Sequence, residues 1–565
     1  MILNKLKILK KKFNSFNIDG YVVPKNDEFF SEYSEKNRLK IISNFSGSAG
    51  LAIILKNKNF LFVDGRYTHQ AQKQSGKEFK IIEIHKFLPK KIMKNLNLGI
   101  DPSLFTEKML KFYFGKNFKF TKIRENLIDK IYLEKKNKKN DIFSLSKKIA
   151  GESHSSKIKK IKKILSHNKC DYLFISAPEN VAWILNIRGW DNPNSPISNC
   201  RCVISKNGKV FLLVEKIKAK KIVREKKLRS NQIINPENFG DLIFKLKGKK
   251  FMIDEDSCSI LNKSIISSKF KIIKKTDPCY KLKAIKNYTE INNMKNSHIE
   301  DGVALTKFIF WIKNLNKKKI NEINAKKKLE RFRKLNKNYL RPSFETISAT
   351  GSNAALPHYI PTKKSNKDIK KNNIFLCDSG GQYKYGTTDV TRTICFQNQK
   401  KRVRDIFTKV LKGHIAVATA NLNKDQTGKQ IDRRARKYLK KDGLDYAHGT
   451  GHGVGFFSNV HEGPQSITKT NTIKLEEGMV VSNEPGYYEK DNFGIRIENL
   501  IYVKKKNKKL FFENLTLAPI EKSLINYNLL NKQEKNYLTM YHLEVYSKLS
   551  KYLNFKERKW LATFI

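Results

Sequence analysis

The sequence predicts an α/β (α+β) protein in which two related α/β modules precede a larger, strand-rich domain and a short C-terminal extension. Its 565 residues exceed a single ordinary core, because domains average roughly 150 residues. Hydrophobic residues make up 39% of the chain, which is enough for several buried cores. Short apolar runs alternate with basic, helix-like stretches in the first half. These observations favour a globular chain with more than one domain.

The first module is predicted to span residues 1–145. Its strand-like runs are DGYVVP (19–24), LAIIL (51–55) and FLFVD (60–64), and the stretch RYTHQAQKQ that follows is helix-like. Strands that alternate with helices indicate an α/β fold.

The second module is predicted for residues 146–282, and it echoes the first. A basic helix-like stretch at 156–165 leads into the strand-like run at 171–176. The segment 38–66 resembles the segment 179–215, in each case a helix-like stretch, a turn-rich loop and an apolar strand. We therefore expect a diverged domain duplication.

The third domain, residues 283–505, is predicted to begin with a long amphipathic helix over 283–314. Strands are expected to dominate from residue 344 through the region of Glu498. The extension, residues 506–565, is rich in Tyr and Leu at helical spacing, so we expect its aromatic side chains to pack in a core or an interface.

The formal charge of +62 raises the possibility of nucleic-acid binding. Lysine is spread along the whole chain, however, and arginine is scarce, without a zinc-finger or RNP-type motif. A compositional bias explains this distribution better than a binding stripe, so we expect no specific nucleic-acid partner.

The cysteines and apolar runs indicate a cytoplasmic protein. The seven cysteines form no CxxC pair, which is typical of a reducing compartment. The N-terminus is basic and interrupted by lysine, unlike a signal peptide, and no run approaches the length of a membrane span. We expect no membrane association.

Five residues between 378 and 498 carry the strongest chemical signal. Four carboxylates and one imidazole, each in a Gly-rich or strand-like phrase, are typical of a two-metal site. They are Asp378 in LCDSGG, Asp389 in TTDVTR, His452 in HGTGHGVG, Glu484 in SNEPGYY and Glu498 in IRIENL. Because they are far apart in sequence, only a folded domain can gather them, and such a domain is expected to be a hydrolase.

The surroundings of these residues refine the prediction. Asp378 and Asp389 are expected on paired strands, where divalent cations would offset their mutual repulsion; the alternative is two turn aspartates. The glycines around His452 disfavour a zinc-binding helix and instead indicate close backbone approach. Arg496 lies two residues from Glu498, so we expect the two to share a strand face and Arg496 to orient a carboxylate; a surface salt bridge is the alternative.

Across nearly its whole length the chain resembles aminopeptidase P (Xaa-Pro aminopeptidase), of the creatinase and methionine aminopeptidase "pita-bread" metallopeptidases. The phrases that carry this resemblance are NFSGSAG, LFVDGRYT, ILNIRG, ISATGSNAALPHY, DSGGQYKYGTTDVTRT, HGTGHGVGFFSNVHEGP, SNEPGYY and GIRIENL. It implies two creatinase-like N-terminal modules, a pita-bread catalytic domain and a homodimer.

The resemblance also implies residue roles. Asp378 binds one metal, Asp389 and Glu498 bridge both, and His452 and Glu484 complete the ligand set of the second metal. His358, His448 and His461 are implied to line the active site.

The expected reaction is release of the N-terminal residue from peptides with proline in second position. The attacking group would be a hydroxide shared by two metals. We assign proton acceptance to Glu484, and stabilisation of the tetrahedral intermediate to His461 with His358. The oxygen-rich ligand set favours two Mn²⁺ per subunit, with cobalt or zinc as alternatives.

Two other functions stay open. A prolidase restricted to dipeptides would share the fold and the metal ligands, although the two N-terminal modules and the extension fit aminopeptidase P better. A noncatalytic pita-bread protein that binds nucleic acid or a partner protein is the alternative of another class; such proteins usually lose metal ligands.

Overall fold

The chain forms two compact units. The structure is a computed structural model that describes residues 2–32, 36–132, 140–315 and 319–565. The first unit comprises residues 1–146, 152–193 and 197–279, and the second comprises residues 147–151, 194–196 and 280–565, in both cases within the described ranges. Within those ranges, every helix is too short or too polar to span a lipid bilayer.

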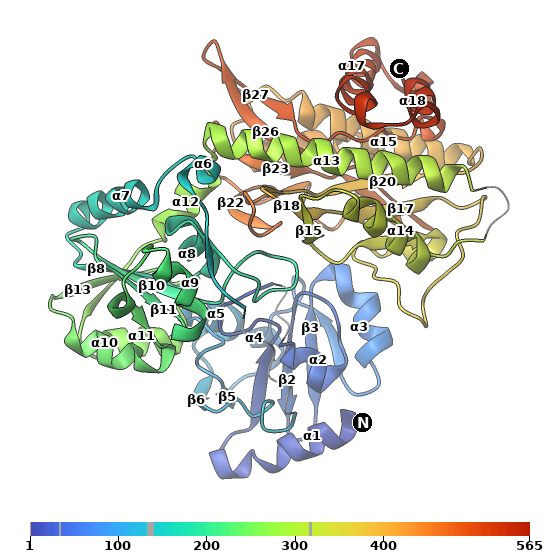
Figure 1. The fold of residues 1–565 in the computed structure, drawn as a ribbon. Helices are drawn as coiled ribbons and strands as arrows, with labels where there is room; N and C mark the ends of the chain where they lie inside the picture. Colours follow the sequence, from blue (N-terminus) through green and yellow to red (C-terminus); the bar gives the residue numbers. More distant parts are fainter. Residues whose placement is uncertain (1, 33–35, 133–139, 316–318) are drawn as a thin grey trace. The chain divides into compact units, whose positions relative to one another are not determined.

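The first unit contains two six-stranded sheets, blue and green in Figure 1. The first has the order β4-β3-β2-β1-β5-β6. Its strands are β1 (Gly20–Pro24), β2 (Gly50–Leu55), β3 (Asn59–Val63), β4 (Lys80–Glu83), β5 (Asn97–Ile100) and β6 (Lys119–Lys122). Its helices are α1 (Ile2–Lys11), α2 (Arg38–Ser43), α3 (Thr68–Ser75), α4 (Pro89–Ile92) and α5 (Glu107–Phe114).

The second sheet of this unit has the order β12-β11-β10-β8-β13-β14. Its strands are β8 (Tyr172–Ile175), β10 (Arg201–Ser205), β11 (Val210–Leu213), β12 (Ile233–Ile234), β13 (Lys250–Ile253) and β14 (Lys271–Lys274). Its helices are α7 (His154–His167), α8 (Pro178–Ile184), α9 (Lys220–Arg224), α10 (Phe239–Lys245) and α11 (Ile260–Ser267). The short strands β7 (Phe143–Ser144) and β9 (Ile187–Arg188) pair beside it.

The two sheets repeat the same pattern of strand directions. In each, the central strand pairs antiparallel with the next strand along the chain and parallel with a later one, as β1 does with β2 and β5, and β8 with β10 and β13. The outermost strands on both sides are parallel to their neighbours. This shared topology is what a domain duplication produces.

The second unit contains the strands that carry the predicted metal ligands. Its sheets have the orders β16-β17-β20, β22-β21-β23-β26-β27, β15-β18-β19 and β24-β25. Their bounds are β15 (Tyr339–Pro342), β16 (Ile347–Thr350), β17 (Phe375–Ser379), β18 (Gly381–Tyr383), β19 (Gly386–Thr387), β20 (Val390–Ile394), β21 (Gly451–Gly453), β22 (Glu462–Ile467), β23 (Val480–Asn483), β24 (Gly486–Glu489), β25 (Phe493–Arg496), β26 (Asn499–Lys506) and β27 (Lys509–Asn514).

Long helices accompany these strands, and the helix α13 crosses them in Figure 1. They are α13 (Tyr288–Lys313), α14 (Glu322–Lys334), α15 (Lys401–Ala418), α16 (Gly428–Lys440), α17 (Lys532–Leu549) and α18 (Phe555–Ala562), besides the short α6 (Lys147–Ala150) and α12 (Pro278–Ala284). The prediction that strands dominate from residue 344 onward missed α15 and α16. Both helices carry buried apolar residues at helical spacing, a pattern that the prediction overlooked.

The predicted helix over 283–314 starts too early. Helix α12 ends at Ala284, and α13 begins at Tyr288. Asn287 caps α13: its side chain accepts a hydrogen bond from the Glu290 amide at 3.1 Å, and Glu290 accepts one from the Asn287 amide at 3.0 Å. This reciprocal pair is a capping box, which fixes the start of a helix.

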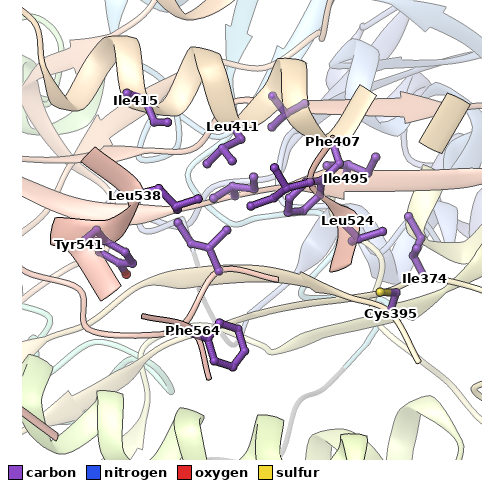
Figure 2. Packing of buried hydrophobic residues seen from close by; sticks show 14 of the residues in the cluster. Ile374, Cys395, Phe407, Leu411, Ile415, Ile495, Leu524, Leu538, Tyr541 and Phe564 are labelled. Atoms are coloured by element: carbon purple, nitrogen blue, oxygen red, sulfur yellow. The ribbon is translucent and has the colours of Figure 1, made fainter. Parts of the chain in front are cut away.

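The C-terminal extension packs into a hydrophobic core of the second unit (Figure 2). Leu538 and Tyr541 of α17 and Phe564 beyond α18 are buried in the same cluster as Leu411 of α15 and Ile495 of β25. The expectation that its aromatic side chains pack is therefore confirmed for Tyr541 and Phe564, whereas Tyr527, Tyr552 and Phe555 are exposed.

Candidate metal centre

The predicted metal ligands lie at the ends or middles of short strands in the second unit. Asp378 is in β17, Asp389 directly precedes β20, His452 is the middle residue of β21, Glu484 directly follows β23, and Glu498 directly precedes β26. Strands β17 and β20 pair antiparallel, with Asp378 opposite Thr391. The two aspartates are therefore on neighbouring strands, as expected.

The structure brings the five side chains together. One ligand atom each of Asp389, His452 and Glu498 lies within 4.8 Å of the other two. The Nε2 atom of His452 is 3.4 Å from Oδ2 of Asp389 and 3.6 Å from Oε1 of Glu484. Asp378 is close enough to Asp389 and Glu484 for their charges to affect its ionisation.

Two carboxylate oxygens of this cluster are buried without a hydrogen-bond partner among the described residues. They are Oδ1 of Asp378 and Oδ1 of Asp389. A buried carboxylate oxygen without a partner is costly, so it calls for a ligand. The Nδ1 atom of His452 lies 2.9 Å from the Gly453 carbonyl oxygen, so an Nδ1–H donor leaves the lone pair of Nε2 toward the carboxylates. This donor set fits divalent cations.

The ionisation of the cluster shows the same need for positive charge. Burial raises the pKa of Asp378 to about 7, with Asp389 and Glu484 adding to the rise and Arg496 opposing it. Burial, then the charges of Asp389, Glu484 and Asp378, raise the pKa of Glu498 well above its usual range. Cations between the carboxylates would reverse this repulsion.

His452 shows the complementary effect. Burial lowers its pKa, but the hydrogen bond to Asp389 and the charges of Glu484 and Asp389 outweigh burial and raise the pKa to about 9. In metal-free protein, the carboxylates therefore favour the protonated, positively charged form of His452.

Arg496 pairs with the carboxylate of Asp378, and it does not lie on one strand with Glu498. Strand β25 ends at Arg496 and β26 begins at Asn499, so Arg496 and Glu498 do not share one strand, and that prediction is wrong. Arg496 instead donates from Nη2 to Oδ2 of Asp378 at 2.6 Å. Its side chain is only 3% exposed, so this ion pair is not a surface salt bridge.

Glu498 is oriented by a hydroxyl that the sequence analysis missed. Oγ1 of Thr391 donates to Oε2 of Glu498 at 2.7 Å and accepts from Nε of Arg496 at 3.1 Å. Thr391 follows Asp389 by two residues in TDVTR, but its partners are more than a hundred residues away along the chain. Only the folded structure reveals this link.

The predicted histidines lie around the cluster in different ways. The ring of His461 is perpendicular to that of His452, with centroids 4.3 Å apart. Nε2 of His448 is 2.8 Å from the hydroxyl of Tyr488, which also accepts a hydrogen bond from Arg496. His358 is half-buried after the 3-10 helix η6 (Gly351–Ala355), next to Pro357, whose carbonyl accepts from Arg496 at 3.2 Å.

The glycines beside His452 permit close backbone packing. A Cβ atom on Gly451 would lie 1.9 Å from the Ser482 carbonyl oxygen, and one on Gly453 would lie 2.2 Å from that of Glu462. His452 therefore lies on a strand whose backbone closely approaches the neighbouring segments. The expectation of close backbone approach, in place of a zinc-binding helix, is confirmed.

A buried charge cluster beside His461 also escaped the sequence analysis. Glu462 accepts hydrogen bonds from Lys286 and from Lys283, the latter at 2.8 Å, and all three side chains are buried. Lysine is so frequent here that no sequence signal distinguishes these two from the rest.

Comparison with known proteins agrees with this geometry. The model of metallopeptidase family M24 matches residues 292–505, and that of the C-terminal region of peptidase M24 matches residues 508–563. Models of the creatinase/prolidase N-terminal domain match residues 5–130 and 134–290. The predicted fold class is confirmed, while the domain boundaries near residues 145, 282 and 505 stay predictions.

Individual relatives match over the full length. A probable Xaa-Pro aminopeptidase P of Laccaria bicolor is 37% identical over 99% of this chain and 92% of its own length. Xaa-Pro aminopeptidase 1 of Dictyostelium discoideum is 36% identical over 100% of this chain and 96% of its own.

Solved structures give the same result. An X-prolyl aminopeptidase of Caenorhabditis elegans, described as a cytosolic enzyme with a di-nuclear active site, has a TM-score of 0.92 and 31% identity over 100% of this chain and 99% of its own. A prolidase of Pyrococcus horikoshii has a TM-score of 0.52 and 25% identity, and it covers 65% of this chain and 99% of its own. The resemblance to aminopeptidase P is thus confirmed.

The ionisation of the cluster predicts how stability depends on pH in metal-free protein. The folded pKa of Asp378 is about 7 against an ordinary 3.8, so its stabilising contribution is present at low pH and is lost as pH rises toward 7. The pKa of His452 is about 9 in the folded protein and ordinarily 6.5. Its contribution to the free energy of unfolding is therefore lost as the pH rises from 6.5 to 9.

We therefore expect the melting temperature of chelator-treated protein to fall as the pH rises from 5 to 9, because both stabilising contributions are lost over this range. The variant Asp378→Asn should show a smaller fall between pH 5 and pH 7, because it lacks the titrating carboxyl. Thermal melts of both proteins at several pH values measure this. Equal pH dependence in the two proteins would contradict the assignment of the raised pKa to Asp378.

Proposed function

The chain belongs to the Xaa-Pro aminopeptidases of metallopeptidase family M24, and we propose that it releases the N-terminal residue from peptides with proline in the second position. One observation carries the chemistry: five donors from separate segments of the chain converge, and two of their buried carboxylate oxygens have no hydrogen-bond partner among the described residues. The full-length likeness to the C. elegans enzyme supports the substrate class.

We propose that the cluster holds two divalent cations. Asp378 would bind one, Asp389 and Glu498 would bridge both, and His452 and Glu484 would complete the second. When bound, such a pair lowers the pKa of a shared water molecule and polarises the scissile carbonyl group. Four of the five donors are carboxylates, which favours Mn²⁺ over metals that prefer thiolates, with cobalt and zinc as alternatives.

The side chains around the cations divide the remaining tasks. Glu484 accepts the proton of the attacking water, and the hydroxyl of Ser482, which donates to its Oε1 at 3.1 Å, orients it. His461 and His358 donate hydrogen bonds to the oxygen of the tetrahedral intermediate. His448, held by the Tyr488 hydroxyl, lines the site.

Proline explains why a dedicated enzyme is needed. The bond before proline is a tertiary amide without an N–H donor, and the ring restricts φ, so a general peptidase that binds an extended backbone by its amides handles it poorly. A metal-activated attack needs no hydrogen bond from this amide. The P. horikoshii prolidase covers only 65% of this chain, and the greater length of this chain supports an aminopeptidase P over a prolidase.

Assembly and location are also proposals. We propose a homodimer, a state that sedimentation measures directly. We propose a cytoplasmic location, supported by the description of the C. elegans relative as a cytosolic enzyme. The reading of the chain as a noncatalytic binding protein is disfavoured because all five donors are present and gathered in space.

The substrate assignment predicts a difference between peptides. With Mn²⁺ present, the protein should release arginine from Arg-Pro-Pro at a much higher rate than from the dipeptide Arg-Pro, and chelation should abolish both. Chromatographic detection of free arginine measures this. Preference for the dipeptide would indicate a prolidase. A salt-dependent gel shift without metal-dependent cleavage would indicate the noncatalytic alternative.

The assignment of Glu484 predicts the effect of one substitution. Glu484→Gln removes the proton acceptor while keeping the size of the side chain, so kcat should fall by about 10²–10⁴-fold. Glu489→Gln is the matched control, because Glu489 pairs with the exposed Arg402 and should leave turnover unchanged. Circular dichroism checks that both variants fold. Near-normal turnover in Glu484→Gln would refute the assignment.

A further inference from the structure

The guanidinium of Arg392 is buried among neutral acceptors. Arg392 is in β20, three residues after Asp389, and it is only 1% exposed. Among the described residues, no carboxylate forms an ion pair with it. A buried cation of this kind is costly, so its hydrogen bonds must be extensive for it to be tolerated.

Those hydrogen bonds are unusually complete. Five N–H donors of the guanidinium meet six acceptors, so at least one donor is shared. Nε donates to the Pro519 carbonyl at 3.0 Å, Nη1 to the carbonyls of Thr391 at 2.8 Å and Glu498 at 2.6 Å, and Nη2 to Asn499 Oδ1 at 2.8 Å, the Ala518 carbonyl at 2.9 Å and the Tyr541 hydroxyl at 2.8 Å. The arginine therefore joins three separate segments of the chain.

One of these segments carries Glu498. Arg392 fixes the Glu498 carbonyl, the Thr391 carbonyl accepts from the Glu498 amide at 3.1 Å, and the Thr391 hydroxyl donates to the Glu498 carboxylate. Both backbone groups and the side chain of Glu498 are thus held by the pair Thr391–Arg392. Glu498 lies between β25 and β26, outside either strand, so its position depends on these hydrogen bonds to Thr391 and Arg392 of β20.

Another segment belongs to the C-terminal extension. Ala518 and Pro519 offer their carbonyls to Arg392, and Tyr541 of α17 offers its hydroxyl. Tyr541 also donates to the Ala518 carbonyl at 2.7 Å and is 4% exposed. The adjacent His542 accepts from the Ile520 amide at 3.1 Å, so α17 pins the segment 518–520 in place.

We infer that Arg392 and Tyr541 are positioning residues for Glu498, so that the C-terminal extension forms part of the metal centre and not only of the core. This inference rests on the proposed metal site. Neither side chain contacts the ligand cluster directly; they act by fixing the backbone from which Glu498 projects. Residues that orient metal ligands in this way commonly change metal affinity when they are altered.

The test measures Mn²⁺ binding to chelator-treated, full-length protein by titration calorimetry. Arg392→Lys keeps the charge but has only three donors for six acceptors, so we expect the affinity for Mn²⁺ to fall by about 10–100-fold. Tyr541→Phe removes one hydroxyl and keeps the ring, so we expect a smaller fall, of about threefold to tenfold.

Tyr546→Phe is the matched control. Tyr546 is on the same helix and packs against the same core cluster, and its hydroxyl is not among the acceptors of Arg392. Its Mn²⁺ affinity should equal that of the unchanged protein. A merely structural role would lower the melting temperature of Tyr541→Phe without changing its Mn²⁺ affinity, so the two measurements together separate stability from positioning.

The outcomes are distinct. Weaker Mn²⁺ binding in Tyr541→Phe and in folded Arg392→Lys, with Tyr546→Phe unchanged, would support the inference. If Arg392→Lys does not fold, Tyr541→Phe decides alone. Unchanged affinity in Tyr541→Phe would overturn the role of the extension. Absence of Mn²⁺ binding in the unchanged protein would overturn the proposed metal site, and the inference with it.

Discussion

Mutual repulsion among buried carboxylates is the constraint on which the second unit depends. Asp378, Asp389 and Glu498 are buried beside the half-buried Glu484, and burial, followed by the neighbouring negative charges, raises the pKa values of Asp378 and Glu498. His452 and Arg496 supply part of the opposing charge. Bound cations would offset the negative charge that remains, and they would supply the chemistry of a catalytic centre.

The fold gathers this cluster by placing ligands where strands begin and end. Asp389 and Glu498 lie just outside β20 and β26, and Glu484 just outside β23. Side chains in such positions need not alternate between the two faces of a sheet, but other residues must hold them in place. Thr391, Arg392 and Arg496, all buried, provide these through hydrogen bonds to residues about a hundred positions away.

The sequence singled out the five side chains that the fold brings together, but not the residues that hold them in place. Asp378, Asp389, His452, Glu484 and Glu498 stand in Gly-rich or strand-like phrases, and the close packing of Gly451 and Gly453 explains why such phrases mark a site. Thr391 and Tyr488 were missed because a hydroxyl reveals its partner only after folding.

Some predicted helices and strands were misplaced or overlooked, each for a local reason. The start of α13 depends on the capping box of Asn287 and Glu290. Helices α15 and α16 bury apolar residues that recur at helical spacing, and the prediction overlooked this period between the phrases that carry the site. The wrong placement of Arg496 and Glu498 on one strand has a similar origin, because a period of two residues assumes an unbroken strand.

The central claim is that five side chains hold a pair of cations. The most direct measurement is an anomalous difference map from crystals of the protein grown with Mn²⁺ and recorded near the manganese absorption edge. The account predicts two peaks about 3.5–4 Å apart, one contacted by Asp378 and the other by His452, with Asp389 and Glu498 between them. A single peak, or peaks away from these residues, would contradict it.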